Sequence, residues 1–193
     1  VEATTVNKMC GSGLQAVMMA SDSLMAGSAD VIVAGGMESM SNAPHMLPNS
    51  RSGNRYGNFQ AVDHMAFDGL TNAYDGQPMG VFGEDCVSKY GFSREDQDAW
   101  AIQSVQRAQA AAASGAFADE ITPVTVASRK GEVQLSVDEQ PGRSDIGKIP
   151  TLRPAFKKDG TITAASSSSI SDGAAALVLM SADTAAAQGI APL

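Results

Sequence analysis

Residues 3–36, ATTVNKMCGSGLQAVMMASDSLMAGSADVIVAGG, contain three patterns of secondary structure in succession. The first four residues alternate small and β-branched side chains, which predicts a buried strand over residues 3–6. A helix is then predicted up to Gly27, because apolar residues recur at helical spacing at Leu14, Val17, Met18, Leu24 and Met25. Residues 30–36, DVIVAGG, form an apolar run that is typical of a strand buried on both faces of a parallel sheet. The stretch therefore predicts a strand–helix–strand unit and an α/β fold.

The periodicity disappears between residue 37 and about residue 92, where Gly, Asn, Pro, Asp and Met accumulate. Irregular stretches of this length inside a compact protein are usually functional. The next segment begins with Ser93 and an acidic residue three positions on, Asp96. This pair predicts a capped helix, which is expected to end near Gly115.

The last third of the chain returns to strand patterns. Residues 120–127 and 132–139 predict two strands that SRKG joins into a hairpin. A loop rich in Pro and Gly is expected over residues 140–159. Residues 174–180, AAALVLM, predict a second fully apolar strand, and the start of a helix follows. The order of these elements predicts a layered α/β core that is interrupted by a large excursion.

Composition narrows the class of protein. The chain has 193 residues and a net charge of −8 without a basic tract, which argues against nucleic-acid and membrane partners. Its two cysteines, Cys10 and Cys86, show no metal-ligand spacing, so neither a metal site nor a disulfide framework is predicted. We expect a soluble cytoplasmic protein, with the mitochondrial matrix as the alternative. Both ends of the sequence look abrupt, and a fragment is expected.

Cys10 stands at the junction between the first predicted strand and the first predicted helix. A thiol at a helix start lies near free backbone N–H groups, which favour the thiolate and so activate a nucleophile. Gly11 and Gly13 would let the backbone turn tightly and a substrate approach closely. The alternative is a buried structural thiol, because cysteine is among the most buried residue types.

Motifs along essentially the whole chain, in order, resemble the thiolase family of acyl-CoA acetyltransferases: VNKMCGSGLQAV, ADVIVAGGMESMS, NAPH, GLTNAY, MGVFGED, SREDQDAWAIQSVQRA, LRPAFKKDGTITA and ISDGAAALVLMSA. The resemblance implies a layered α/β/α core with a large inserted α+β loop domain that holds coenzyme A. The core would be present in part, as residues 1–39 and 171–193, and the loop domain would span residues 40–170.

The resemblance also implies a chemistry. In that family the cysteine matching Cys10 takes an acyl group as a thioester, and a second acyl-CoA, deprotonated at its α carbon, attacks it to give a 3-ketoacyl-CoA. The reverse reaction is thiolysis. Coenzyme A thioesters are the substrates, and no other cofactor and no metal is expected. A homodimer or homotetramer is expected from the likeness alone. A ketoacyl synthase of the same superfamily is disfavoured by the long insertion.

The family's coenzyme A contacts would fall on seven residues of this sequence. Six match pantetheine or coenzyme A contacts: Leu70, Met79, Ala155, Phe156, Ala164 and Ser168. Arg143 lies in the region that reaches the nucleotide in relatives. It belongs to a cluster of seven of the thirteen basic residues, Arg129, Lys130, Arg143, Lys148, Arg153, Lys157 and Lys158. Such a cluster would attract the phosphates, although a solvated basic face is the alternative for any one member.

The sequence departs from the family pattern in several places. Pro78 stands where relatives have a histidine, and Ser166 replaces an asparagine. The second half of a thiolase, which carries the GHP histidine, the NEAF asparagine and the CxG cysteine, is not in the sequence. His45 and His64 are expected to be ordinary loop histidines, and Cys86 to be a packing residue. A truncated, non-catalytic acyl-CoA-binding or partner module of thiolase fold is therefore the alternative to the enzyme.

Overall fold

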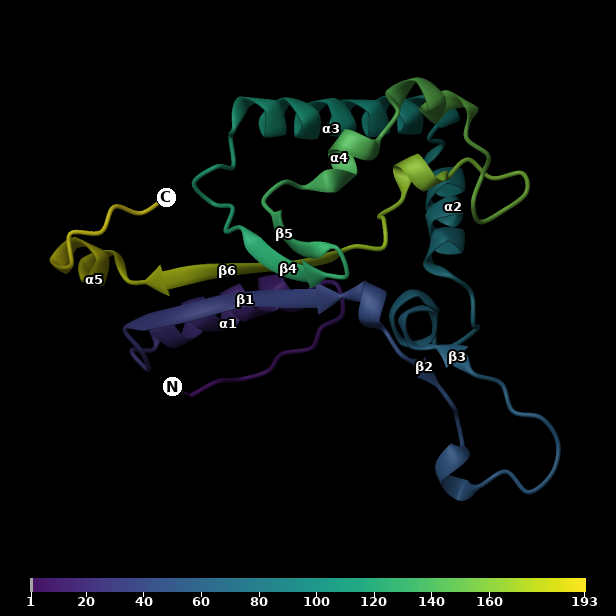
Figure 1. Ribbon diagram of the computed structural model, residues 1–193, viewed down its shortest axis with the longest axis horizontal. Helices are drawn as coiled ribbons and strands as arrows, with labels where there is room; N and C mark the ends of the chain where they lie inside the picture. The colour runs from purple at the N-terminus through teal and green to yellow at the C-terminus, as the bar shows by residue number, and fades with distance from the viewer. Residues whose placement is uncertain (1) are drawn as a thin grey trace. The chain divides into compact units, whose positions relative to one another are not determined.

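The computed structural model describes residues 2–193 (Figure 1). The chain forms two compact units: the first comprises the chain up to Thr71 together with Ile170–Leu193, and the second comprises Asn72–Ser169. Each unit is described by itself. The domain boundaries expected from the family likeness, at residues 39/40 and 170/171, stay a prediction.

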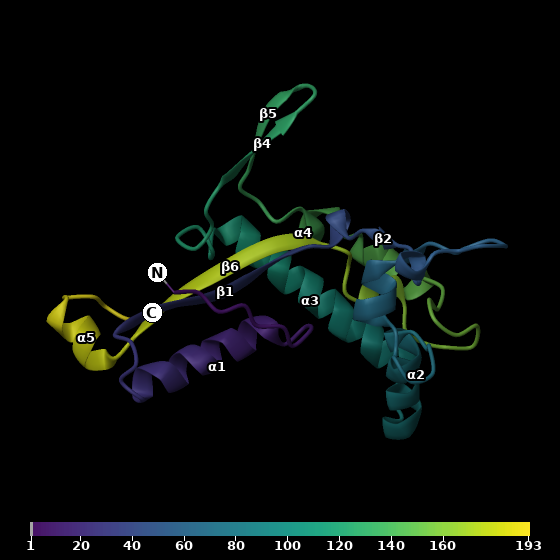
Figure 2. The same ribbon diagram turned by 90° about the horizontal axis from the view of Figure 1, so that it is seen from below.

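The first unit contains a helix on a two-stranded sheet. Its main elements are α1 (Ser12–Met25), β1 (Val31–Ser39), β6 (Asp172–Met180) and α5 (Ala182–Ala187). Strands β1 and β6 are antiparallel, in a register that runs from Val31 opposite Met180 to Ser39 opposite Asp172. Helix α1 runs along this sheet (Figure 2). It ends where the sequence predicts, because Gly27 adopts a φ of 67° that glycine tolerates without cost.

Two expectations about this unit are wrong. Residues 3–6 form no strand, and most of them are exposed, because β1 and β6 pair with each other and residues 3–6 gain no hydrogen-bonding neighbour. Strand β1 is antiparallel to its partner rather than part of a parallel sheet, and it is not buried on both faces. Val33 is 69% exposed and Met37 87% exposed, since α1 covers only part of this sheet.

The chain between β1 and Thr71 is largely irregular, as predicted. Its short elements are η1 (Met40–Asn42), β2 (His45–Met46), η2 (Ser50–Ser52), β3 (Val62–Asp63) and the π-helical turn η3 (Met65–Leu70). The Asp172 carboxylate accepts hydrogen bonds from the backbone N–H of Ser41, at 3.0 Å, and from the Ser41 hydroxyl. These bonds, that of the hydroxyl first, hold the pKa of Asp172 below its usual value. They tie the turn after β1 to the first residue of β6.

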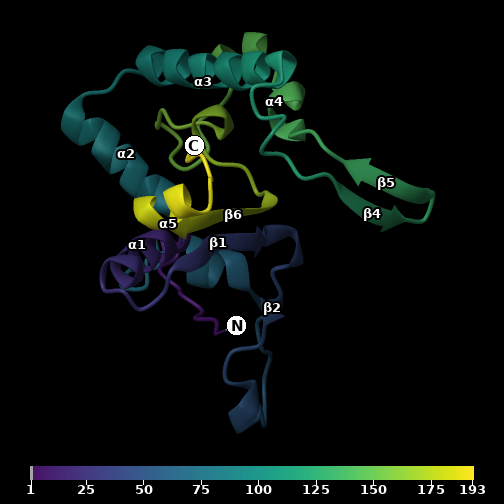
Figure 3. The same cartoon turned by 90° about the vertical axis from the view of Figure 1, so that its left-hand side faces the viewer.

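The second unit is built around a long helix. Its elements are α2 (Met79–Tyr90), α3 (Arg94–Ser114), β4 (Val124–Ser128), β5 (Gly131–Leu135), α4 (Glu139–Arg143), η4 (Ile146–Thr151) and η5 (Ala164–Ser166). The Ser93 hydroxyl caps α3 by accepting the Asp96 N–H at 3.0 Å, and Gly115 ends the helix with a φ of 69°, as predicted. The predicted hairpin is confirmed as β4 and β5, which project away from α3 and α4 (Figure 3).

Two parts of the second unit are more regular than the sequence predicts. Helix α2 has 12 residues, whereas the sequence indicates only the start of a short helix near Cys86. Glycines weaken its helical pattern, but the packing requires them: a Cβ on Gly80 would lie 2.1 Å from the Phe156 ring, and one on Gly83 would lie 2.6 Å from Ile162. The Pro/Gly loop expected over residues 140–159 also contains η4 and most of α4. Among the described residues, no helix is both long and apolar enough to cross a membrane.

Candidate active site

Cys10 lies in a tight turn directly before α1. The Gly11 N–H donates to the Lys8 carbonyl at 3.0 Å, and the Ser12 hydroxyl accepts the Lys8 N–H at 2.7 Å. The Cys10 thiol is exposed and free, which does not fit the alternative of a buried structural thiol. The other cysteine, Cys86, is also exposed on α2, so its predicted packing role is wrong.

The residue before Cys10 has an unusual backbone conformation. Met9 has a φ of 50°, in the left-handed region, which costs a non-glycine residue on the order of 1–3 kcal/mol. Its N–H donates to the Asn7 side chain at 3.0 Å, and its carbonyl accepts the Ser12 N–H at 3.1 Å and the Ser12 hydroxyl at 2.7 Å. These bonds hold the conformation. Sequence reasoning missed it, because methionine gives no signal for a left-handed residue.

The first unit also holds Leu70 and both histidines. Leu70 ends η3 and is partly exposed, in a different unit from the other predicted coenzyme A contacts. His45 lies in β2 opposite Asp63, and His64 Nε2 lies 3.2 Å from the Asp68 carboxylate. Among residues 2–193, no group of three or more His, Cys, Asp or Glu side chains could hold a metal ion.

The second unit brings several predicted contacts together around the start of α2. Met79 is the first residue of α2, and the neighbouring Gly80 faces the ring of Phe156. The Ala155 N–H donates to the Ile162 carbonyl at 2.9 Å, which ties the loop of Phe156 to the strand-like segment after it. Ala164 begins η5. Within the segment 155–168, residues 156–162 therefore contact α2, and the η5 turn contacts α3.

Ser168 lines an open groove of about 660 Å³ in the same unit. The groove lies between the C-terminal half of α2, the first half of α3 and the serine-rich segment 165–168. Trp100 and Phe92 supply apolar walls, and Ser104 supplies a hydroxyl. Six of its twelve lining residues are polar, so the groove offers both apolar and hydrogen-bonding surface.

Arg143 occupies a different part of the unit. It ends α4 and lies 3.1 Å from the Glu139 carboxylate, with both side chains exposed. Lys148, from the same basic cluster, pairs with Asp145 at 3.1 Å, and this contact holds the pKa of Asp145 below its usual value. Acidic neighbours therefore partly neutralise the predicted cationic surface, a feature that a count of basic residues does not show.

Glu84 is a site residue that sequence reasoning missed. Its side chain is buried, with the residue 4% exposed, and it faces the backbone of the segment that follows Phe156. Its carboxylate accepts the N–H groups of Thr161, at 2.9 and 3.1 Å, and of Ile162, at 2.8 Å. The signal that could have found it is an acid inside the apolar run of MGVFGED, next to the predicted contact Met79.

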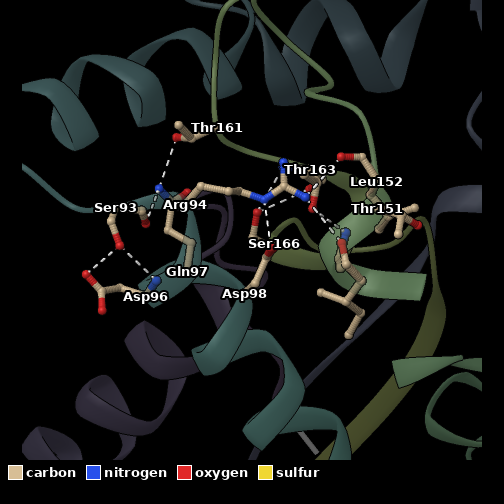
Figure 4. Close-up of polar contacts among 12 residues, drawn as sticks. Ser93, Arg94, Asp96, Gln97, Asp98, Thr151, Leu152, Thr161, Thr163 and Ser166 are labelled. Atoms are coloured by element: carbon tan, nitrogen blue, oxygen red, sulfur yellow. Dashed lines mark hydrogen bonds and ion pairs between the residues drawn. The ribbon is translucent and has the colours of Figure 1, made fainter. Parts of the chain in front are cut away.

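Arg94 is a second missed residue, at the start of α3 (Figure 4). Its Nε lies 2.8 Å from the Asp98 carboxylate, and its guanidinium donates to the carbonyls of Ile149 and Leu152 at 3.2 and 2.9 Å. Beside it, the Gln97 amide donates to the Thr161 hydroxyl at 3.0 Å. The first turn of α3 thus anchors both segments that flank Ala155 and Phe156.

The first unit holds an exposed thiol at a helix start, and the second unit holds loops that are hydrogen-bonded to α2 and α3. The family profile described as the thiolase N-terminal domain matches residues 1–183. The chain belongs to the thiolase family, of which it contains the N-terminal domain.

Relatives support this assignment over the whole chain. An acetyl-CoA acetyltransferase of Chromobacterium violaceum is 53% identical over 194 residues, covering 99% of this chain and 49% of the relative. One of Pseudomonas aeruginosa is 48% identical over 192 residues, covering 98% of this chain and 49% of the relative. The chain thus spans about half the length of these relatives.

Solved structures agree with the fold. The Acat5 thiolase of Ascaris suum, crystallised in complex with coenzyme A, matches with a TM-score of 0.88 and 42% identity, covering 97% of this chain and 48% of that one. An acetyl-CoA acetyltransferase of Syntrophomonas wolfei matches with a TM-score of 0.89 and 41% identity, covering 97% and 47%. The predicted α/β thiolase fold is confirmed.

Proposed function

We propose that this chain forms the acyl-accepting half of an acetyl-CoA C-acyltransferase, with Cys10 as the nucleophile. One observation carries the proposal: Cys10 is a free, exposed thiol on a hydrogen-bonded turn at the start of α1. Relatives named acetyl-CoA acetyltransferase, at 47–53% identity over nearly the whole chain, support the reaction class.

The first step of the proposed reaction exchanges one thioester for another, and the second forms a C–C bond. The Cys10 thiolate attacks the carbonyl carbon of acetyl-CoA, the bond between that carbon and the coenzyme A sulfur breaks, and coenzyme A leaves as a thiolate that takes up a proton. A second acyl-CoA then loses a proton from its α carbon. The resulting carbanion attacks the acetyl carbon, a C–C bond forms, and the Cys10 thiolate leaves.

The thiol suits both directions of this reaction. A thiolate is a good nucleophile and a good leaving group, so neither the acylation nor the release of Cys10 needs strong activation. In the family, the groups that move the protons belong to the GHP and CxG motifs, which lie outside this sequence.

The second unit would bind the part of coenzyme A that does not react. Met79 begins α2, and Ala155, Phe156, Ala164 and Ser168 lie in a segment that contacts α2 and α3, which supports their predicted contacts with pantetheine. Leu70 of the first unit and Arg143 of α4 complete the proposed set. An exposed arginine can donate two parallel hydrogen bonds to a phosphate.

Alkylation of the two cysteines tests the proposal. Both thiols are exposed, so Cys86 serves as an internal control for access. In the protein expressed from its complete gene, we expect iodoacetamide to label Cys10 faster than Cys86, and acetyl-CoA to protect Cys10 alone. Equal labelling rates, with no protection by acetyl-CoA, would contradict a nucleophilic role for Cys10.

A second candidate function is coenzyme A binding without catalysis. The observation that favours it is the grouping of six of the seven predicted contacts in a compact unit that does not contain Cys10. Calorimetry of coenzyme A with the 193-residue chain, combined with a thiolysis assay, separates the candidates. Binding without turnover would support the module, and measurable turnover would eliminate it.

We also propose a homodimer or homotetramer, as the likeness to the family implies. Sedimentation of the protein expressed from its complete gene tests this assembly. A monomer at micromolar concentration would contradict it.

A further inference from the structure

We infer that Glu84 is a positioning residue for the coenzyme A-binding segment 155–168, an inference that rests on the function proposed above. The carboxylate contacts none of the predicted ligand-binding residues directly. It acts through the backbone of Thr161 and Ile162, which lie in the middle of that segment.

The contacts of Glu84 use both of its oxygens. Oε1 accepts the N–H groups of Thr161 and Ile162 at 2.9 and 2.8 Å, and Oε2 accepts the Thr161 N–H at 3.1 Å and the Thr161 hydroxyl at 3.3 Å. An ionised carboxylate only accepts hydrogen bonds, so it suits a site where every facing group is a donor. Burying a carboxylate is costly unless such donors surround it. The helix therefore holds this segment by its backbone.

The packing around Glu84 leaves no space for a larger neighbour. A Cβ on Gly160 would lie 2.3 Å from Glu84 Oε1, so a side chain there would displace the carboxylate. One residue earlier on α2, Gly83 faces the Ile162 side chain in the same way. The glycines on both elements allow the helix and the segment to approach closely, and the carboxylate fixes their register.

Hydrogen bonds lead from Glu84 to the predicted contacts on both sides. Ile162 donates its N–H to Glu84 and accepts the Ala155 N–H at 2.9 Å with its carbonyl, which places Phe156 against the start of α2. In the other direction, Thr163 is fully buried, and its hydroxyl accepts the Ala165 N–H at 3.2 Å, which caps the turn that begins at Ala164. One carboxylate thus fixes the positions of three predicted contacts.

The chain offers a matched control next to Glu84. Asp85 also reaches this segment from α2, and its carboxylate lies 2.7 Å from Lys157 Nζ. Both partners of that ion pair are exposed, and exposed pairs contribute little. Asp85→Asn therefore removes a carboxylate contact between the same two elements without removing a backbone anchor.

A positioning role predicts a particular kinetic signature. The segment would hold the non-reacting part of coenzyme A, which is bound equally in the ground state and the transition state. Loss of such uniform binding raises KM and leaves kcat unchanged. If Glu84→Ala lowers the ordered fraction of the segment to between a tenth and a hundredth, the apparent Kd rises by about 10- to 100-fold.

The experiment compares Glu84→Ala, Glu84→Gln and Asp85→Asn with the wild type, using coenzyme A calorimetry and thiolysis kinetics of the protein expressed from its complete gene. Hydrogen exchange of the Thr161 and Ile162 amides reports the anchor itself. We expect faster exchange, a raised Kd and a raised KM in Glu84→Ala, with kcat within about twofold. Glu84→Gln keeps one acceptor oxygen and should be intermediate, and Asp85→Asn should stay within about twofold of the wild type throughout.

If the wild type binds coenzyme A, the proposed function is supported, and three outcomes for the variants would still overturn the inference about Glu84. The first is faster amide exchange in Glu84→Ala with unchanged Kd and KM, which would leave Glu84 a purely structural role. The second is an equal effect of Asp85→Asn. The third concerns the case in which Glu84→Ala does not fold. Glu84→Gln is then the variant that tests the inference, and an unchanged Kd of folded Glu84→Gln for coenzyme A would contradict it. A wild type that does not bind coenzyme A would overturn the proposed function itself.

Discussion

Replacing Gly80 by alanine tests the close contact between α2 and Phe156. The added methyl group would lie 2.1–2.3 Å from three atoms of the Phe156 ring. Carbon atoms in contact are normally about 3.5–4.0 Å apart, so the ring has to move by more than about 1 Å or leave its place. Overpacking of this kind costs about 1–3 kcal/mol. Alanine recovers about 0.5–1 kcal/mol of helix propensity. We therefore expect a net loss of about 0–2.5 kcal/mol in the free energy of unfolding, against a gain where the added methyl group meets no neighbour.

Gly13→Ala is the matched control for this variant. Gly13 is the second residue of α1, as Gly80 is of α2, and nothing lies within 4 Å of its added Cβ. Urea unfolding of both variants should show Gly13→Ala unchanged or slightly stabilised and Gly80→Ala destabilised. If Gly80→Ala is as stable as Gly13→Ala, Phe156 does not rest on α2 as the structure has it. We also expect Gly80→Ala to weaken coenzyme A binding, because Phe156 is a proposed contact.

Three further variants test other anchors. Ser93→Ala removes the cap of α3 and should lower the free energy of unfolding by about 1 kcal/mol, measured in urea, and an unchanged midpoint would contradict the capping role. Arg94→Met leaves the buried Asp98 carboxylate without its ion-pair partner and should cost about 3–5 kcal/mol, whereas Arg94→Met with Asp98→Leu should recover part of that loss in thermal unfolding. Ser41→Ala removes the hydrogen bond that the hydroxyl donates to Asp172 and keeps that of the backbone N–H. The folded pKa of Asp172 is lowered, so the ionised carboxylate stabilises the fold at pH values above the unfolded pKa near 3.8. This stabilisation is lost as the pH falls through the folded pKa. The wild type should therefore lose more stability between pH 5 and pH 2 than Ser41→Ala. Parallel pH profiles of the two proteins would contradict this role.

Local chemistry made parts of the fold predictable. The signals for α3 lie within a few residues of its ends, since Ser93 caps its start and Gly115 ends it in the left-handed region. The hairpin of β4 and β5 could be predicted equally well, because two short strands and their turn are contiguous in the sequence. The apolar runs identified β1 and β6 as strands.

Long-range contacts explain what the sequence did not reveal. The direction and exposure of β1 depend on its pairing with β6, far along the chain, and the strand expected over residues 3–6 gained no neighbour. The glycines of α2 are needed for close packing, but they weaken its helical pattern, so the sequence predicted irregular chain over most of this helix. The burial of Glu84 depends on its contact with Thr161, which is 77 positions away.

The residues of the candidate site also differ in whether local sequence patterns identified them. Cys10 could be singled out from its place between two local patterns, and the motifs of the family added the seven predicted coenzyme A contacts. The supporting residues Glu84 and Arg94 were not singled out, since they hold Thr161 and Leu152, which lie 77 and 58 positions further along the chain. The left-handed Met9 was hidden for a similar reason, because Asn7 and Ser12 form its hydrogen bonds only in the folded turn.

The acyl-enzyme itself is the most direct test of the proposed function. The protein expressed from its complete gene is incubated with acetyl-CoA, quenched in acid, digested and mapped by mass spectrometry. We expect one acetyl group, bound as a thioester to Cys10, with Cys86 unmodified and with loss of the label on addition of coenzyme A. An unmodified Cys10, or acetylation of Cys86 to the same extent, would contradict the assignment of Cys10 as the acyl-accepting nucleophile.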